Sequence, residues 1–377
     1  MAAILKPRHA GLFSLLKDMT IRELLQTGLQ HYQRGQLDDA EQRFREVLRR
    51  DRDCVPGLNL LGMLYVNCDR SAEAVTLIER ALQLKPDDHQ AHGNLGLAHQ
   101  RLGEPELAEG HFLRSLQLKP ENPLILQSLG TILAERARYE EAVENFERSL
   151  RLNHNNPQCW VNLSQALVEQ GRLERAIQAA REAVKLNPRM PEALYQVAEV
   201  YRKASRFDQA AASYRKLIEL DDRFLDAYLG LAVTYRQKED SNSALALLRK
   251  TIASFPEFAP AHSALGVLQE QLGDKEAAAE SFKRAIALAP EAVKPHAQLA
   301  LLKGRCSSDE EIAAMENLRA RAQLSSDDLS ELCFGLGEAY HQIGAHDQAF
   351  AAWRQANQIR AERSPCLLYT SDAADED

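Results

Sequence analysis

Three histidines near the start of one predicted helix are the residues whose types suggest metal chemistry. His89, His92 and His99 have the spacing His-x2-His-x6-His, and imidazoles are frequent ligands of zinc. However, His92 and His99 occupy the same places in a 34-residue period as Trp160 and Leu167. Because large residues at those places are expected to pack, we predict that the histidines pack too. We therefore expect no metal site.

Other residues with catalytic potential form no recognisable motif. The sequence contains no Gly-x-Ser-x-Gly elbow, Walker loop or dinucleotide fingerprint. Carboxylate pairs are plentiful, but on an amphipathic helix such pairs usually form a solvated face. Cysteines lack any Cys-x-x-Cys pair, which predicts reduced, packed thiols and a cytoplasmic protein. We expect no catalytic residue and no cofactor, and hence no enzyme activity in this chain. The six cysteines are at positions 54, 68, 159, 306, 333 and 366.

The charge pattern argues against two classes of partner. The 377 residues carry a net charge of −8. The last residues of the chain contribute half of it through Asp372, Asp375, Glu376 and Asp377. An acidic balance disfavours nucleic acid, and no stretch approaches the roughly 20 apolar residues of a membrane helix. The sequence therefore argues against nucleic acid and membranes as partners.

The elements that must position any site are set by a period of 34 residues. An alanine recurs at this spacing eight times, and twelve residues before each lies a small residue. Ala, Leu, Glu, Arg and Gln dominate the composition, which favours helices. The alanines are Ala40, Ala74, Ala108, Ala142, Ala176, Ala210, Ala244 and Ala278, and the small residues are Gly28, Gly62, Gly96, Gly130, Ser164, Ala198, Ala232 and Gly266.

Each column has a physical role in a helical hairpin. A small residue in the first helix permits close approach of the second helix, where the alanine offers an opposing small surface. Gly35, Gly103, Gly171 and Gly273 stand where a left-handed residue ends the first helix. Proline cannot continue a helix, so it should close the second one. The prolines of this column are Pro86, Pro120, Pro188, Pro256 and Pro290.

These columns resemble the tetratricopeptide repeat. The resemblance implies an all-α fold, a right-handed superhelical solenoid of about ten helix-turn-helix hairpins that binds proteins. We expect an N-terminal extension over residues 1–20 and eight repeats over 21–292. A divergent ninth repeat and joint should follow over 293–329, then a final hairpin over 330–365 and a non-native tail over 366–377.

The joint after the eighth repeat resembles a second family. Leu-Ser-x-x-Asp at residues 324–328, Phe-x-Leu-Gly-x-Ala-Tyr at 334–340 and Asp-x-Ala-Phe-x-x-Trp-Arg-Gln-Ala-Asn at 347–357 are similar to bacterial proteins in which a repeat array precedes a sulfotransferase domain. The likeness implies the substrate-recruiting region of a truncated sulfotransferase. The alternatives are the repeat region of an O-linked glycosyltransferase and a stand-alone assembly scaffold.

The same joint shapes the expectations for the C-terminal end. Ser307-Ser-Asp-Glu310 predicts a capping box that opens a helix to about Gln323, and Ser325 should open the next helix. Residues 366–377 resemble a translated sequencing adapter. Because terminal repeats normally need a polar outer face, we expect self-association through this uncapped end.

The predicted site is the concave groove lined by the first helices of the hairpins. Repeat positions 2, 5, 6, 9 and 12 should face it, and they are rich in amides and arginines. Amides donate and accept hydrogen bonds, so they suit the backbone of an extended peptide, and arginines suit carboxylates. The candidate groove residues are Asn59, Asn94, Gln127, Asn162, Gln165, Gln196, Arg202 and Arg236.

Overall fold

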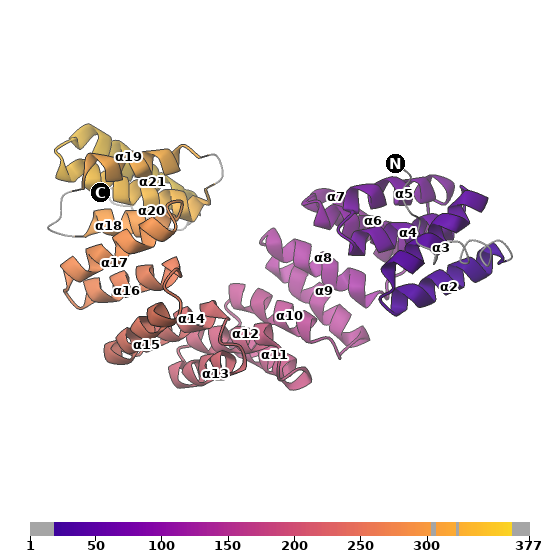
Figure 1. Ribbon diagram of the computed structural model, residues 1–377, viewed down its shortest axis with the longest axis horizontal. Coiled ribbons are helices and arrows are strands. Elements are labelled where there is room, and N and C mark those ends of the chain that lie inside the picture. Colours follow the sequence, from indigo (N-terminus) through magenta and orange to yellow (C-terminus); the bar gives the residue numbers. More distant parts are fainter. Residues whose placement is uncertain (1–18, 303–306, 322–323, 364–377) are drawn as a thin grey trace, which may run out of the picture. The chain divides into compact units, whose positions relative to one another are not determined.

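The computed structural model describes residues 19–302, 307–321 and 324–363 and divides into two units, residues 1–200 and 201–377. Within these described residues every regular element is a helix, which confirms the all-α prediction. Figure 1 shows helical hairpins within each unit, with their two helices side by side. Residues 1–18 of the proposed extension, the whole proposed tail over 366–377 and Cys306 lie outside the described residues. No described helix is long and apolar enough to cross a bilayer.

The helices of the regular hairpins start at a constant interval. First helices have 13 residues and second helices 14, and both kinds recur every 34 residues through Leu288. The first unit contains α2 (Ile21–Gln33), α3 (Leu37–Arg50), α4 (Val55–Asn67), α5 (Ser71–Leu84), α6 (His89–Arg101), α7 (Pro105–Leu118), α8 (Pro123–Glu135), α9 (Tyr139–Leu152), α10 (Pro157–Glu169), α11 (Leu173–Leu186) and most of α12 (Pro191–Lys203). The second unit contains α13 (Phe207–Leu220), α14 (Leu225–Gln237), α15 (Ser241–Ser254), α16 (Ala259–Gln271), α17 (Lys275–Leu288), α18 (Val293–Leu301), α19 (Asp309–Arg319), α20 (Ser326–Gln342) and α21 (His346–Arg363).

The turns inside the hairpins share one backbone conformation. Gly35, Gly103, Gly171 and Gly273 have φ between 71° and 86°, as predicted for helix terminators. The other four turns place a side-chain-bearing residue in the same left-handed conformation, which is costly for any residue except glycine. These residues are Asp69, Ala137, Ser205 and Glu239, with φ between 56° and 62°.

One detail of the core differs from the prediction: the side chain that packs closest to the small residue of the first helix is not the column alanine. The column alanines are buried, and their backbone comes close to the small residue: a Cβ on Gly96 would lie 3.2 Å from the Ala108 carbonyl oxygen. The tighter neighbour is the large residue four positions after the alanine. A Cβ on Gly96 would lie 2.6 Å from the Phe112 ring, and one on Gly62 2.4 Å from Ile78.

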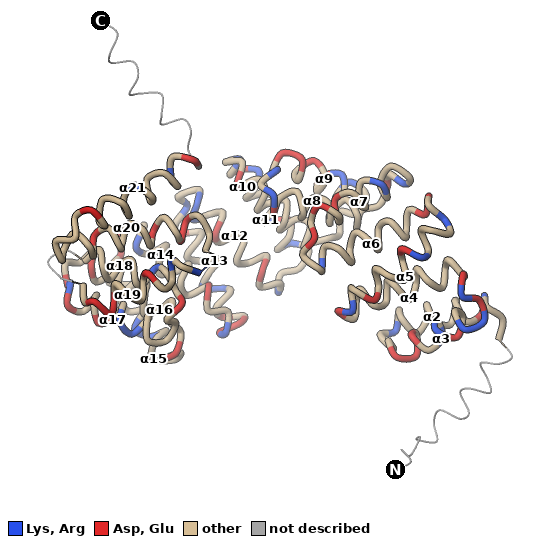
Figure 2. The backbone as a smooth tube through the Cα atoms, turned by 90° about the horizontal axis from the view of Figure 1, so that it is seen from above, with Lys and Arg blue, Asp and Glu red and all other residues tan. Residues whose placement is uncertain are grey.

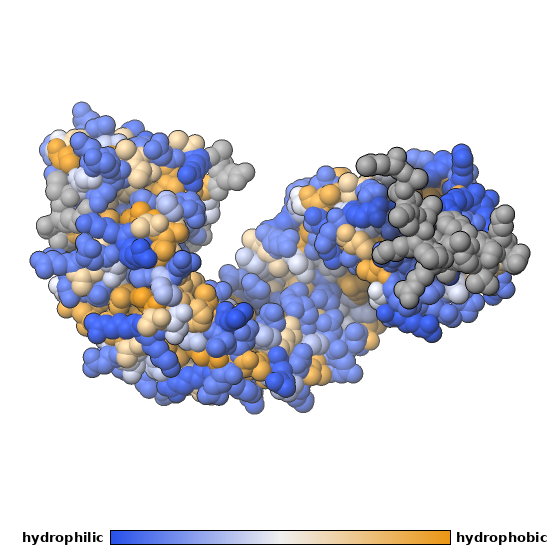
Figure 3. All heavy atoms as spheres, viewed as in Figure 1, coloured by the Kyte–Doolittle hydropathy of each residue, from blue (hydrophilic) through white to orange (hydrophobic). Residues whose placement is uncertain are grey.

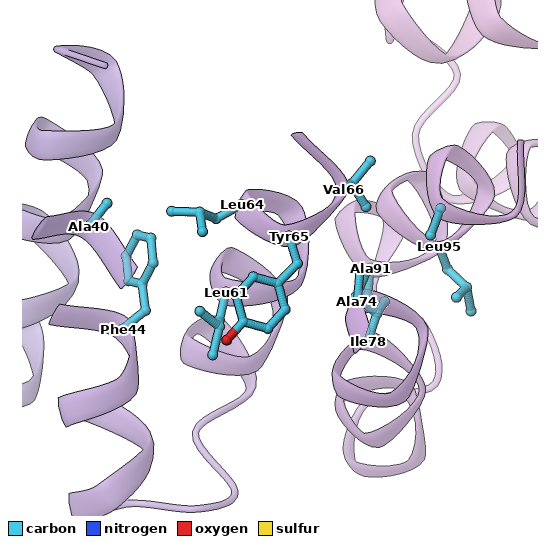
Figure 4. Packing of buried hydrophobic residues seen from close by; sticks show 11 residues of the cluster. Ala40, Phe44, Leu61, Leu64, Tyr65, Val66, Ala74, Ile78, Ala91 and Leu95 are labelled. Carbon is cyan, nitrogen blue, oxygen red and sulfur yellow. The ribbon is translucent and has the colours of Figure 1, made fainter. Parts of the chain in front are cut away.

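Successive hairpins share their apolar contacts. Figure 4 shows Phe44 and Ala40 of the first hairpin facing Leu61 and Leu64 of the second, with Ile78 beyond them. One hairpin therefore cannot bury its own apolar face, and each stabilises its neighbours. Buried Cys54, Cys159 and Cys333 and half-buried Cys68 are free thiols within these cores, as expected.

The joint departs from the regular pattern and from part of its prediction. The capping box is formed by Ser308 and Glu311, one residue later than predicted, and α19 ends at Arg319 rather than near Gln323. Ser325 caps α20 as predicted, accepting from the Asp328 N–H. The helix α18 packs mainly against α20, where a Cβ on Gly335 would lie 2.8 Å from the Ala297 Cα.

Candidate functional site

A hollow between two successive first helices contains two of the predicted residues. Asn162 and Gln165 of α10 line it together with Thr131 and Glu135 of α8, and its volume is about 330 Å³. We call it the α8–α10 hollow; its other lining residues are Ala134, Tyr139, Phe146, Ala166 and Glu169. Gln165 is exposed and makes no side-chain hydrogen bond within the described part of the chain. It is therefore available to a ligand.

Most of the other predicted amides are bonded to the neighbouring hairpin. The Asn94 amide donates to Asn59 Oδ1 across α6 and α4 at 2.8 Å. Asn162 donates in the same way to Thr131 Oγ1 at 3.3 Å, and Gln196 donates to Ser164 Oγ at 3.2 Å. These amides therefore link successive first helices. The prediction treats them as side chains that are free to bind a peptide. Each retains further donor or acceptor capacity for a ligand.

The remaining candidates lie apart from the hollow. Gln127 Oε1 accepts from Asn156 Nδ2 at 2.7 Å in the first unit. In the second unit, Arg202 Nη1 donates to Gln237 Oε1 at 3.5 Å, and Arg236 lines a smaller apolar hollow of about 180 Å³. The eight residues thus fall at several separate places along the two units. Whether they form one continuous binding surface stays a prediction.

Sequence reasoning missed two carboxylates at the hollow. Glu135 and Glu169 both occupy position 13 of their repeats, one helical turn after position 9, which Thr131 and Gln165 occupy. Residues four apart lie on one face of a helix, so position 13 belongs with the groove positions. The hollow is consequently more acidic than the amide pattern suggested. Figure 2 shows acidic and basic segments interspersed along the helices of both units.

Comparisons with known proteins follow the periodicity of the helices. Models of the tetratricopeptide repeat match residues 31–97, 87–153 and, in four overlapping segments, 128–293. The chain belongs to the tetratricopeptide repeat family. The matched segments run from the first tetratricopeptide hairpin to the start of α18. A search of curated proteins found no match to the chain.

Solved structures agree with the tetratricopeptide fold. A tetratricopeptide repeat protein from Parabacteroides merdae is 19% identical with a TM-score of 0.54, and the match covers 66% of this chain and 98% of that one. Yeast Tom70 is 14% identical with a TM-score of 0.53, and the match covers 90% of this chain and 92% of that one. At these identities the likeness establishes the fold alone. The tetratricopeptide array as a class supports a protein–protein interaction scaffold.

The histidines have a packing role in the tetratricopeptide hairpins, as predicted for His92. Its Nε2–H donates to the Pro86 carbonyl at 2.9 Å. Other side chains at the same repeat position donate an equivalent hydrogen bond to the carbonyl six residues earlier. Trp160 Nε1–H, for example, donates to the His154 carbonyl at 3.0 Å. His99 is buried and bonds Glu104 at 2.6 Å. Among the described residues, no cluster of three His, Cys, Asp or Glu has the arrangement of a metal site.

A third imidazole completes this packing. His111 of α7 stacks on His99 and His92 at ring-centroid distances of 5.5 and 5.4 Å, and its Nδ1 lies 3.1 Å from the His92 Nδ1. Burial, with a smaller contribution from the two neighbouring imidazoles, lowers the pKa of His111 to about 4. His111 is therefore neutral in the folded protein at pH 7.

Acid should weaken the first unit through His111. Its folded pKa of about 4 lies below the ordinary value of 6.5, so the unfolded chain binds the proton more readily between these two values. The contribution of neutral His111 to stability is fully present well above pH 6.5 and is lost as pH falls toward 4. Between pH 7 and 5 we expect about 1–2 kcal/mol more loss in the wild type than in His111→Leu. Urea unfolding at both pH values measures this difference, and equal losses would contradict the assignment.

An apolar patch lies on α21 in the second unit. Phe350 is 65% exposed, and the side chains of Phe334, Trp353 and Ala361 line the hollow beside it. Figure 3 shows hydrophobic residues gathered between hydrophilic ones on the visible face of both units. Self-association through the end of the array stays a prediction.

Proposed function

We propose that this chain is a scaffold that binds an extended peptide segment of a partner protein in the α8–α10 hollow. The observation that carries the proposal is the exposed amide of Gln165 beside Asn162, between successive first helices. An amide donates and accepts, so it matches both groups of a peptide backbone without selecting one sequence. The flanking Thr131 hydroxyl adds a further polar contact.

The carboxylates give this peptide a charge preference. Glu135 and Glu169 both line the hollow, and each is exposed. A Lys or Arg side chain next to the bound backbone would pair with them, whereas an acidic side chain would be repelled. In the second unit, Arg202 and Arg236 favour carboxylates instead. We infer that the two units differ in the charge that each favours in a bound peptide.

The test uses a peptide selected from a randomised display library on the whole chain. For the selected peptide, labelled with a fluorophore, we expect Asn162→Ala/Gln165→Ala to raise the Kd about tenfold or more. Gln209→Ala on α13 removes an exposed amide that lines neither this hollow nor any other described one and should leave the Kd unchanged. A peptide whose Kd is the same for all three proteins would contradict the proposal.

A second candidate rests on the residues of the joint. The hairpin pattern changes between α18 and α20, where the sequence is similar to the approach to a sulfotransferase domain. We propose that the array recruits substrates for such an enzyme in the cytoplasm; an O-linked glycosyltransferase is the alternative. Reading the gene beyond codon 365 in its genome tests this. A phosphate-binding loop in frame supports the sulfotransferase, and a stop codon there contradicts both enzymes.

A further inference from the structure

A larger hollow lies on the opposite side of α10. It is bounded by the second helices α9 and α11, with Trp160, Leu163 and Leu167 of α10 between them, and its volume is about 1060 Å³. We call it the α9–α11 groove. On a helix of 3.6 residues per turn these three side chains point away from Asn162 and Gln165. The groove is therefore a separate surface from the α8–α10 hollow.

A short side chain at one repeat position helps to leave the groove open. Ala179 occupies repeat position 23, where the third hairpin carries His111. His111 fills the space between His92 and His99, which correspond to Trp160 and Leu167. With only a methyl group at Ala179, the equivalent space stays open. The other residues at this position are Arg43, Leu77, Asn145, Ser213, Leu247 and Ser281, and all are larger than alanine.

The floor of the groove is apolar. Leu150, Leu163, Leu167 and Ala179 are buried against the surrounding helices, yet each contributes to the lining. Trp160 is half-buried, and its Nε1–H is fixed by the His154 carbonyl at 3.0 Å, which holds the indole in place. A preformed apolar surface with a rigid aromatic side chain suits a bulky apolar group of a ligand.

The rim of the groove is basic. Four cations and two carboxylates line it, and both carboxylates are already paired: Glu147 with Arg175, and Glu182 with Lys185. Arg151 on α9 and Arg181 on α11 are exposed and make no ion pair within the residues that the structure describes. They stand on the two helices that bound the groove, so a ligand in the groove lies between two available guanidinium groups.

We propose that the α9–α11 groove binds an acidic peptide segment of a partner protein, with a bulky apolar side chain on Trp160 and carboxylates on Arg151 and Arg181. Guanidinium groups bind carboxylates with paired hydrogen bonds, and the apolar floor would bury the bulky apolar side chain of the peptide. This partner is distinct in charge from the one expected at Glu135 and Glu169. One array thus holds two segments of opposite charge on the two faces of α10.

The test measures fluorescence anisotropy of a labelled acidic peptide in which Phe and Leu alternate with Asp and Glu. Two matched peptides replace either the acidic residues with lysine or the apolar residues with alanine. We expect the acidic, apolar peptide to bind about tenfold or more tightly than either, and to weaken as salt rises. Equal binding of the three peptides would overturn the proposal.

Variants place the binding in this groove. Ala179→Phe fills the space much as His111 does in the third hairpin, so the fold should be kept; a thermal melt checks this. Ala179→Phe and Arg151→Glu/Arg181→Glu should each weaken binding about tenfold or more. Arg148→Glu, an exposed arginine on α9 outside the groove, should change it less than about twofold. Unchanged affinity in Ala179→Phe would overturn the assignment.

Two further outcomes separate the alternatives. Asn162→Ala/Gln165→Ala should leave the affinity for the acidic peptide unchanged. Binding in the α9–α11 groove is therefore tested independently of the proposal that the α8–α10 hollow binds a peptide. A wild-type dimer in sedimentation that becomes monomeric in Ala179→Phe would overturn the acidic peptide in favour of a second copy of the chain.

Discussion

Gly130→Leu is expected to lower the free energy of unfolding of the first unit by about 2–3 kcal/mol, because it overpacks a closed contact. A Cβ at Gly130 would lie 2.7 Å from Phe146 Cε1 and 2.8 Å from its Cδ1. Phe146 is itself almost fully buried, so its ring has little room to move. The gain in helix propensity on replacing glycine offsets only part of this cost. Urea unfolding followed by circular dichroism measures the loss.

Gly110→Leu is the matched control. Gly110 also lies inside a helix, α7, but a Cβ there would meet nothing within 4 Å. The same substitution should therefore stabilise the protein slightly, by up to about 1 kcal/mol. Adding Phe146→Leu to Gly130→Leu should make the pair less destabilising than the sum of the single changes. Equal effects at Gly130 and Gly110 would contradict the close contact.

Phe112→Ala should have the largest effect, about 3–5 kcal/mol, because it empties the centre of one hairpin. Phe112 is fully buried and lies over Gly96 of the same hairpin. Leu113→Ala, one residue later on α7 and 45% exposed, should change stability by less than about 0.5 kcal/mol. Similar losses in the two variants would show that the packing assignment is wrong.

The damage from Phe112→Ala should also be local. Stability in a repeat array is close to a sum over hairpins and their neighbours, so protection from hydrogen exchange should fall first in α6, α7 and the hairpins beside them. Mass spectrometry of exchanged peptides follows each helix separately. Loss of protection in α16 and α17 to the same degree would contradict the nearest-neighbour description.

Much of the fold was predictable because it repeats. Eight alanines and five prolines at one period locate every hairpin from α2 to α17, and the glycine column locates four of their eight left-handed turns. The partner of the small column was not predictable in the same way. Whether Ala108 or Phe112 covers Gly96 depends on how far the second helix rotates about its axis, which spacing does not determine. At the joint, Ser307 and Ser308 are equivalent caps by type, and only backbone conformation selects Ser308.

The candidate site was predictable in part for a similar reason. The periodicity assigned Asn162 and Gln165 to first-helix positions, and both line the α8–α10 hollow. The hydrogen bond from Asn94 to Asn59 joins residues 35 apart, so it depends on how two hairpins stack. The α9–α11 groove depends on the short side chain of Ala179 and also on how the surrounding helices pack, which residue spacing does not determine.

The left-handed turns divide the array into strong and weak links. Asp69, Ala137, Ser205 and Glu239 hold a left-handed conformation, which is about 1 kcal/mol or more less favourable for alanine, serine or glutamate than for glycine and less costly for aspartate. The second, fourth, sixth and seventh hairpins therefore spend more time locally open than hairpins that turn at glycine. A protease or a chaperone would meet those turns first, so four turn residues determine the order in which the hairpins of the array unfold.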